Sequence, residues 1–153
     1  MADLFPALAL GDCLDEAQAT IINMKVGAAV TKGQAVKSHT HTVGELCSVQ
    51  PASLGFKALG VALKSGAVGE KIPVLVSGIV KVTASETITI GSPVRAGDAG
   101  TIAIGLYSVT IPSGTVAVTS TSAQPAMTVG GKIAFGTAVQ TFADGDTGLI
   151  LVR

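Results

Sequence analysis

Two histidines and a cysteine come closest to forming a chemical site in this sequence. His39 and His41 alternate in the segment Ser-His-Thr-His-Thr, and in an extended chain this spacing places both imidazoles on one face. Imidazole and thiolate groups bind transition metals, and Cys47 follows shortly after. A transition-metal site normally needs three or four ligands, however, and two histidines in a polar loop are more often solvent-exposed. We therefore expect no metal centre.

Lys71 is the second candidate for chemistry, because it follows Glu70 near a predicted turn. Swinging-arm carrier domains present a modified lysine at a hairpin tip, but the remaining tip motif is missing here. The serines lack a Gly-x-Ser-x-Gly elbow, and the sequence has no phosphate-binding loop or dinucleotide fingerprint. The sequence therefore favours a protein that is not an enzyme and uses no cofactor. An enzyme or carrier domain is the alternative, which an intact-mass measurement would reveal through a modification or a bound metal.

The composition disfavours several classes of partner. Of the 153 residues only 13% are charged, the net charge is zero and the pI is about 6.7. Such a surface offers little attraction to phosphate backbones or anionic membranes, so we expect no nucleic-acid partner and no membrane partner. Asp3 stands where a secretory signal would carry a basic residue, and we expect no signal peptide. Cys13 and Cys47 are then predicted to be free thiols.

An internal repeat organises the chain. Residues 136–152 align without a gap beneath the segment that begins at Gly60, at a constant offset of 136 − 60 = 76. A segment of the form Gly-x-(Ala/Pro)-Val-(Lys/Arg) precedes each copy, beginning at Gly33 and at Gly91. A repeated pattern of this length indicates a repeated structural unit. The corresponding turn pairs are Gly69-Glu70 and Gly145-Asp146, and the corresponding apolar runs are Val74-Leu75-Val76 and Ile150-Leu151-Val152.

The two units differ in length. Gly33 precedes Gly60 by 60 − 33 = 27 residues and Gly91 precedes Gly136 by 136 − 91 = 45, so the second unit is 45 − 27 = 18 residues longer. We place the insertion within residues 102–128, where apolar residues alternate on both sides of a Pro-Ser-Gly bend and predict a β-hairpin. Its polar positions are Thr and Ser, so its edges lack the charges that block pairing with other chains. The alternative is a hairpin that lies on its own core.

Short Val-, Ile- and Thr-rich segments between glycine turns predict an all-β fold. We expect a compact β-sandwich or barrel built from two degenerate repeats, with an extended N-terminal arm and an inserted β-hairpin. The arm would cover residues 1–25 and a single β domain residues 26–153, with repeat one over about residues 26–83 and repeat two over about residues 84–153. The paired apolar runs should form the core, and Val76→Asp is expected to unfold the domain.

The contact elements are predicted to be the parts that the two repeats do not share. The arm would dock on another subunit or partner, or else fold over the core as an ordinary terminal segment. The inserted hairpin is the second such part. The residues predicted to make these contacts are Leu4, Phe5, Pro6, Leu8, Leu10, Leu106, Tyr107, Val109 and Ile111.

Four segments resemble a known family. They are Gly60-Val-Ala-Leu63, Ala67-Val-Gly-Glu-Lys-Ile-Pro-Val-Leu-Val-Ser-Gly-Ile-Val-Lys-Val82, Gly91-Ser-Pro-Val-Arg95 and the closing region from Gly136 to Arg153. Together they resemble the capsid decoration, or cement, proteins of tailed bacteriophages, a family often known only as a domain of unknown function. The resemblance covers roughly residues 26–153 and consists of turns and strands without a catalytic signature.

The resemblance implies a structural virion protein that binds the outside of the expanded capsid, clamps neighbouring capsomers and stabilises the head. Its partners would be the major capsid protein and other copies of itself, as a homotrimer, and it would be made in the host cytoplasm. The predicted contact residues would then be capsid or subunit contacts. The alternative is a fibre or adhesin-type β module, which would bind a host surface in the absence of capsids.

Overall fold

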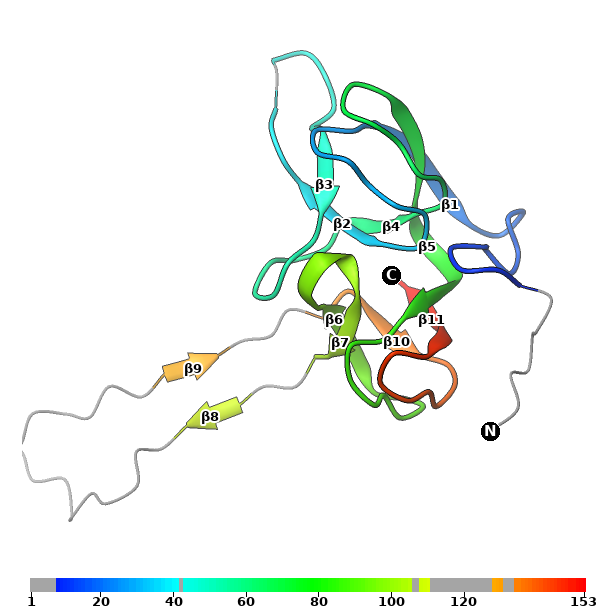
Figure 1. Cartoon of the computed structure of the whole chain (residues 1–153), viewed down its shortest axis with the longest axis vertical. Coiled ribbons are helices and arrows are strands. Elements are labelled where there is room, and N and C mark those ends of the chain that lie inside the picture. The colour runs from blue at the N-terminus through cyan, green and yellow to red at the C-terminus, as the bar shows by residue number, and fades with distance from the viewer. Residues whose placement is uncertain (1–7, 42, 106–107, 111–127, 131–133) are drawn as a thin grey trace, which may run out of the picture.

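The fold is all-β, as the sequence predicted (Figure 1). The structure is a computed structural model, and it describes residues 8–41, 43–105, 108–110, 128–130 and 134–153. Its only helical element within these ranges is the short η1, so no described helix is long and apolar enough to span a membrane. The elements are β1 (Thr20–Lys25), β2 (Ala35–Ser38), β3 (Val49–Pro51), β4 (Gly60–Ala62), β5 (Lys71–Thr83), β6 (Pro93–Ala96), η1 (Asp98–Gly100), β7 (Ile102–Ile104), β8 (Ser108–Thr110), β9 (Thr128–Gly130), β10 (Gly136–Ala138) and β11 (Thr147–Val152).

Nine of the described strands form one curled antiparallel sheet around the long strand β5. The order is β3-β2-β4-β5-β11-β10-β6-β7, and β1 also pairs with β5. Along β5, the first half pairs with β1 and β4 and the second half pairs with β11. The strands β8 and β9 form a separate two-stranded ribbon.

The pairing registers of the two halves of the sheet are equivalent. Ala62 pairs with Val74 between β4 and β5, and the residues 76 positions later, Ala138 and Ile150, pair between β10 and β11. The preceding strands β2 and β6 correspond at an offset of 94 − 36 = 58, since Val36 and Val94 pair with the equivalent glycines Gly60 and Gly136. The corresponding turn glycines all have positive φ, at 85° for Gly33, 81° for Gly91, 92° for Gly69 and 78° for Gly145.

Strand β5 belongs to both halves. Lys25 pairs with Lys71 between β1 and β5, and the equivalent Thr83 and Thr147 pair between β5 and β11. The second half of β5 therefore corresponds to β1, and each repeat begins one strand earlier than the sequence pattern indicated. The expected boundary of the arm at residue 25 differs from the structure for this reason, because Thr20–Lys25 is a strand paired in register within the sheet.

The paired apolar runs contribute to the core, with one exception. Val74, Leu75, Ile150 and Val152 are all buried. Val76 is only partly buried, because it lies where β5 passes from one half of the sheet to the other. The expectation that Val76→Asp unfolds the domain was therefore placed on the wrong residue, and Val74 or Leu75 is the position at which a charge would be fully buried.

The insertion in the second repeat begins later than the sequence indicated. Ile102–Ile104 is β7, a strand of the main sheet that pairs with β6, and Ile102 is buried in the core. The connection from β3 to β4 has 59 − 51 = 8 residues and that from β7 to β10 has 135 − 104 = 31, so 23 residues are added there. The β6–β7 connection is five residues shorter than the β2–β3 connection, which gives the net difference of 18. The expected Pro-Ser-Gly bend lies outside the described residues.

Candidate interaction surfaces

The two histidines lie in a loop of the described structure. His39 and His41 are exposed in the connection between β2 and β3, and His39 Nδ1 lies 3.2 Å from Thr40 Oγ1. Thr40 Oγ1 lies 2.8 Å from Ser48 Oγ, so the polar groups join the two ends of this connection. Within the described ranges no three His, Cys, Asp or Glu side chains gather in a way that could hold a metal ion.

Both cysteines are free thiols, as predicted. Burial raises the pKa of Cys13, and the negative charges of Glu16 and Asp15 raise it further. Cys13 is therefore protonated at neutral pH and packs as a small apolar side chain against the core. Lys71, the other candidate for chemistry, begins β5 rather than capping a hairpin tip, and it lies opposite Lys25.

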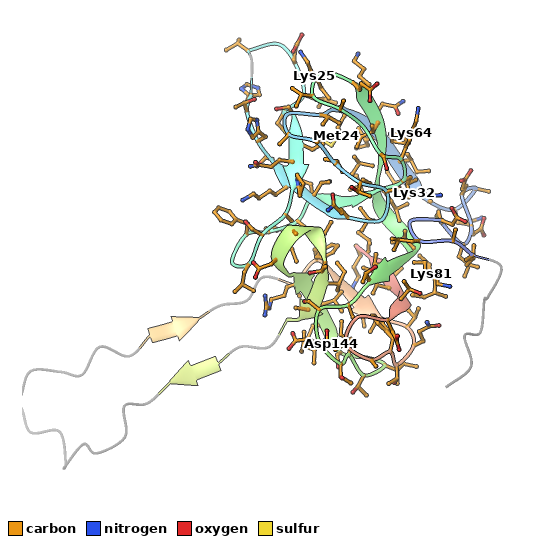
Figure 2. The ribbon with its side chains drawn as sticks, in the orientation of Figure 1. Met24, Lys25, Lys32, Lys64, Lys81 and Asp144 are labelled. Carbon is orange, nitrogen blue, oxygen red and sulfur yellow. The ribbon has the colours of Figure 1, made fainter. Side chains whose placement is uncertain are left out.

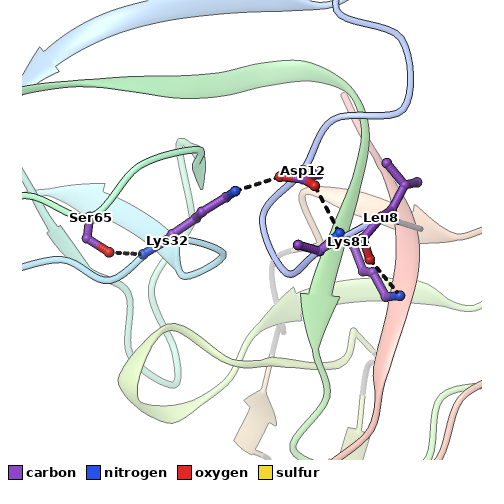
Figure 3. Close-up of polar contacts among 6 residues, drawn as sticks. Leu8, Asp12, Lys32, Ser65 and Lys81 are labelled. Atoms are coloured by element: carbon purple, nitrogen blue, oxygen red, sulfur yellow. Dashed lines mark hydrogen bonds and ion pairs between the residues drawn. The ribbon is translucent and has the colours of Figure 1, made fainter. Parts of the chain in front are cut away.

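Residues 8–14 add a short strand-like segment to the second half of β5 (Figure 3). The amide of Gly11 donates to the carbonyl of Lys81 at 2.7 Å, and the amide of Leu14 donates to the carbonyl of Ile79 at 2.9 Å. Cys13 forms an antiparallel bridge with Val80 between these two hydrogen bonds. The edge of β5 in the second repeat is thus covered by the chain itself.

Side chains clamp the same segment from both sides (Figure 3). The buried Lys81 donates from Nζ to the carbonyl of Leu8 at 3.0 Å. Lys32 Nζ pairs with Asp12 Oδ1 at 2.5 Å, and the backbone amide of Lys32 donates to Ser65 Oγ at 2.9 Å. The hydrogen bond from Lys32 lowers the pKa of the Asp12 carboxyl group. These contacts hold residues 8–14 against the main sheet.

The predicted contact residues therefore divide into three groups. Leu8 and Leu10, partly buried, lie on the domain's own surface: the Leu8 carbonyl is bound by Lys81, and the Leu10 side chain packs over Gly33. Val109 lies in β8, opposite Val129 of β9. The others lie outside the described residues: Leu4, Phe5, Pro6, Leu106, Tyr107 and Ile111.

Strand β1 presents an uncovered edge, which the sequence pattern did not reveal. It pairs with β5 on one side, and from Thr20 to Met24 no described residue pairs with its other side. Just beyond the strand, Val26 bridges Val49 of β3, and the amide of Gly27 donates to the Val49 carbonyl at 2.7 Å. Ile21 and Ile22 are 37% and 38% exposed on this strand, whereas Val80 of β5, the equivalent of Ile22, is completely buried. From Ala17 to Met24 the chain carries no charge, so nothing charged protects this stretch of the edge from pairing with another strand.

A shallow cleft with two unpaired cations adjoins this edge. Lys25 and Lys71, direct cross-strand neighbours, line it together with Asn23, Glu45 and Leu46. The volume of the cleft is about 420 Å³. Within the described structure neither lysine makes an ion pair or a hydrogen bond through its side chain. Like charges that face each other across two strands repel, so an anionic group would be stabilised here. Figure 2 labels Lys25 at this end of the molecule.

Exposed apolar side chains also gather at the loops of the first repeat. Phe56 is 56% exposed in the connection between β3 and β4, where Lys37 Nζ lies 3.5 Å above its ring. In the sequence, these exposed residues are marked only as single large apolar residues within glycine-containing turns. Composition alone does not distinguish such residues from core residues. The other exposed large apolar residues of these loops are Val43, Leu46, Leu54, Leu59 and Val68.

The inserted segment occupies, in the second repeat, the place of the loop that carries Phe56. Ser108–Thr110 pairs antiparallel with Thr128–Gly130 and forms a ribbon apart from the main sheet. Figure 1 shows β8 and β9 side by side and away from the curled sheet. The ribbon therefore lies in the second repeat at the position that the β3–β4 loop has in the first repeat.

Comparisons with known proteins give a match in fold alone. No family model matches the chain, and no curated protein matches it. Among solved structures, the head fiber gp8.5 N base of bacteriophage phi29 has a similar fold, with a TM-score of 0.56 and 15% sequence identity. The match covers 89% of this chain and 95% of that chain. The chain therefore shares its overall fold with that base.

Proposed function

We propose that this chain is a structural protein of a phage head that binds the outside of the expanded capsid and stabilises neighbouring capsomers. The observation that carries the proposal is the shared fold with the base of a phage head fibre over nearly the whole length of both chains. The resemblance of residues 26–153 to capsid decoration proteins supports the same location. Neither line of support depends on a catalytic residue.

The surfaces of the described structure suit a role in assembly. The edge of β1 from Thr20 to Met24, the ribbon of β8 and β9 and several exposed apolar loop residues are surfaces of the kind through which proteins assemble. Strand edges bind extended partners through backbone hydrogen bonds, with specificity supplied by alternate side chains. Several such contacts on one oligomer would act together through effective concentration.

Co-sedimentation with capsids tests the proposal. The purified protein should sediment with expanded heads that lack it, bind unexpanded shells much less and raise the temperature at which the heads open. Failure to bind expanded heads at micromolar protein would contradict it.

Removal of the inserted ribbon tests which element makes the contact. Gly105 and Ala134 are adjacent, since a Cβ placed on Gly105 would lie 3.2 Å from the Cβ of Ala134, so a short glycine linker can replace residues 106–133. We expect this variant to fold and to lose most of its capsid affinity. Asp144→Lys, a charge change on an exposed turn, is the matched control and should bind normally. Full binding after the excision would exclude the ribbon as the main contact.

The neighbour's own description favours one alternative, a fibre or adhesin-type module. Such a module would bind host envelope or purified surface glycan without any capsid. A pull-down of host envelopes by the protein alone, with no affinity for heads, would favour this alternative over decoration.

A further inference from the structure

The main sheet ends in β3 on one side and in β7 on the other, and each end strand is met by chain that follows another strand. In the first repeat the amide of Gly27, just after β1, donates to the Val49 carbonyl of β3 at 2.7 Å. In the second repeat the amide of the equivalent Ser85, just after β5, donates to the Ile102 carbonyl of β7 at 2.9 Å. The end strands of both repeats are therefore held in the same way.

A pair of charged side chains extends this contact in the second repeat. Glu86 Oε1 accepts a hydrogen bond from the Ile104 amide at 2.6 Å, and Arg95 Nε donates to the Ile104 carbonyl at 2.9 Å. Arg95 is buried, its Nη1 donates to the Ala96 carbonyl at 3.2 Å, and its Nη2 lies 3.9 Å from Glu86 Oε1. Both backbone groups of Ile104 are thus bound by one pair of opposite charges, through hydrogen bonds that the charges strengthen.

The first repeat has different residues at the equivalent positions. The registers of β2 with β3 and of β6 with β7 place Pro51 where the second repeat has Ile104. Proline has no N–H, so the first repeat needs no acceptor there, and Ala28 stands in the place of Glu86. The carboxylate and the amide that it binds therefore occur only in the repeat that carries the inserted ribbon.

The residue that this pair holds stands at the base of the ribbon. Ile104 is the last residue of β7, and the amide of the following Gly105 donates to the Pro93 carbonyl at 2.7 Å. On the return side, the amide of Phe135 donates to the Val94 carbonyl at 2.9 Å. A two-stranded ribbon buries little surface of its own, so the contacts at its base decide how it is oriented.

We infer that Glu86 and Arg95 are positioning residues that fix the direction in which the ribbon leaves the sheet. The inference rests on the proposed function for its purpose, because a ribbon that is already oriented loses less conformational entropy when it meets the capsid. Arg95 is held by the core and sets the carbonyl of Ile104, and Glu86 sets its amide. The two side chains do not need to touch the capsid.

Residual dipolar couplings of the full chain, measured by NMR without capsids, test the inference. In the wild type, the backbone couplings of β8 and β9 should fit the alignment tensor of the main sheet. In Glu86→Ala they should lose this fit and become smaller, while the sheet keeps its own. The Glu86 side chain is 45% exposed, so water can reach the Ile104 amide and this variant should stay folded. Glu86→Gln keeps an oxygen that accepts from the amide and should retain the fit.

Glu70→Ala is the matched control. The carboxylate of Glu70 also accepts a hydrogen bond from a backbone amide, that of Ala67 at 2.8 Å, but it does so in a turn of the first repeat. The control should therefore leave the couplings of β8 and β9 as they are in the wild type. Wild-type ribbon couplings that do not fit the tensor of the sheet would overturn the inference, and so would an undiminished fit in Glu86→Ala or an equal loss in Glu70→Ala.

Binding to expanded heads separates a failure of this inference from a failure of the proposed function. Glu86→Ala should bind about three- to ten-fold more weakly than Glu70→Ala, because its ribbon must be ordered on binding. Equal affinities of the two variants would overturn the role of the pair in binding. If no form of the protein binds heads, the proposed function fails, whereas the couplings still decide whether Glu86 and Arg95 orient the ribbon.

Discussion

The two halves of the sheet share a register and differ in how their outer edges are covered. In the second repeat, residues 8–14 lie along β5, the equivalent core position Val80 is fully buried, and Lys81 binds the Leu8 carbonyl. In the first repeat, β1 has no described partner on that side from Thr20 to Met24, and Ile22 is 38% exposed. A duplicated scaffold thus carries one finished edge and one edge open to a partner. The difference shows that two halves with the same pairing register can differ in the exposure of their edges.

The largest expected effect comes from placing a charge at the equivalent core positions. Val80→Asp should unfold the protein, because an unpaired carboxylate in the core costs at least about 3 kcal/mol. Ile22→Asp should change the free energy of unfolding by about 1 kcal/mol or less, since its side chain has access to water. Circular dichroism melts of both variants measure the difference. Equal melting temperatures would show that the two edges are covered alike.

The next effect concerns two equivalent glycines that let strands approach closely. A Cβ on Gly60 would lie 2.1 Å from the carbonyl oxygen of Leu75, and one on Gly136 would lie 2.5 Å from that of Leu151. Both contacts are with backbone, which cannot move aside, so each alanine variant should lose about 2 kcal/mol or more, with Gly60→Ala the more destabilised. Urea unfolding of the two variants provides the comparison. A reversed order would indicate that β10 yields less readily than β4.

A smaller effect is expected at the clamp on residues 8–14. Lys32 lowers the pKa of Asp12, so this carboxylate adds stability that is present above the ordinary carboxyl pKa of about 4 and is lost as the pH falls through the lowered value. The pair is more than one-third exposed and therefore screened, so Asp12→Asn should cost about 0.5–1 kcal/mol at pH 7 and less near pH 3. Urea titrations at both pH values test this. A cost that is independent of pH would show that the charge of this carboxylate does not contribute to stability.

The smallest effect tests the cross-strand pair Lys25 and Lys71. The second repeat has Thr83 and Thr147 where the first has Lys25 and Lys71. Lys71→Thr should raise the stability of the monomer by about 0.2–0.5 kcal/mol at low salt, because it removes the like-charge repulsion. The gain should vanish at 1 M salt, where such charges are screened. A loss of stability at low salt would mean that the lysines are paired in solution.

Much of the fold could be predicted from the sequence because it depends on local and periodic signals. The offset between Gly60 and Gly136 predicted equivalent strand pairs, and the turn glycines such as Gly69 and Gly145 sit where positive φ is required. The free state of Cys13 and Cys47 followed from the same kind of reasoning about composition and context.

The predicted repeat boundaries were wrong because the single long strand β5 belongs to both repeats. Residues 20–25 and 78–83 share one identical residue, Ile21 with Ile79, and the apolar pairs Ile22 with Val80 and Met24 with Val82. This likeness is too short to reveal the repeat without the pairing register. The same continuity made Val76 look like a core residue, although it lies at the crossover within β5. Ile102–Ile104 was joined to the insertion because alternation alone cannot tell a core strand from a hairpin arm.

The sequence by itself determined the class of fold, the duplication and the absence of a recognisable catalytic motif, because periodicity, turn chemistry and composition are properties of the chain. Only the tertiary structure decided which edges are covered. Coverage depends on contacts between residues far apart in the chain, such as Lys81 with Leu8 and Lys32 with Asp12. In the described structure the outer side of Thr20–Met24 has no such backbone contact. Strand edges are completed by whatever backbone lies beside them, which no local pattern encodes.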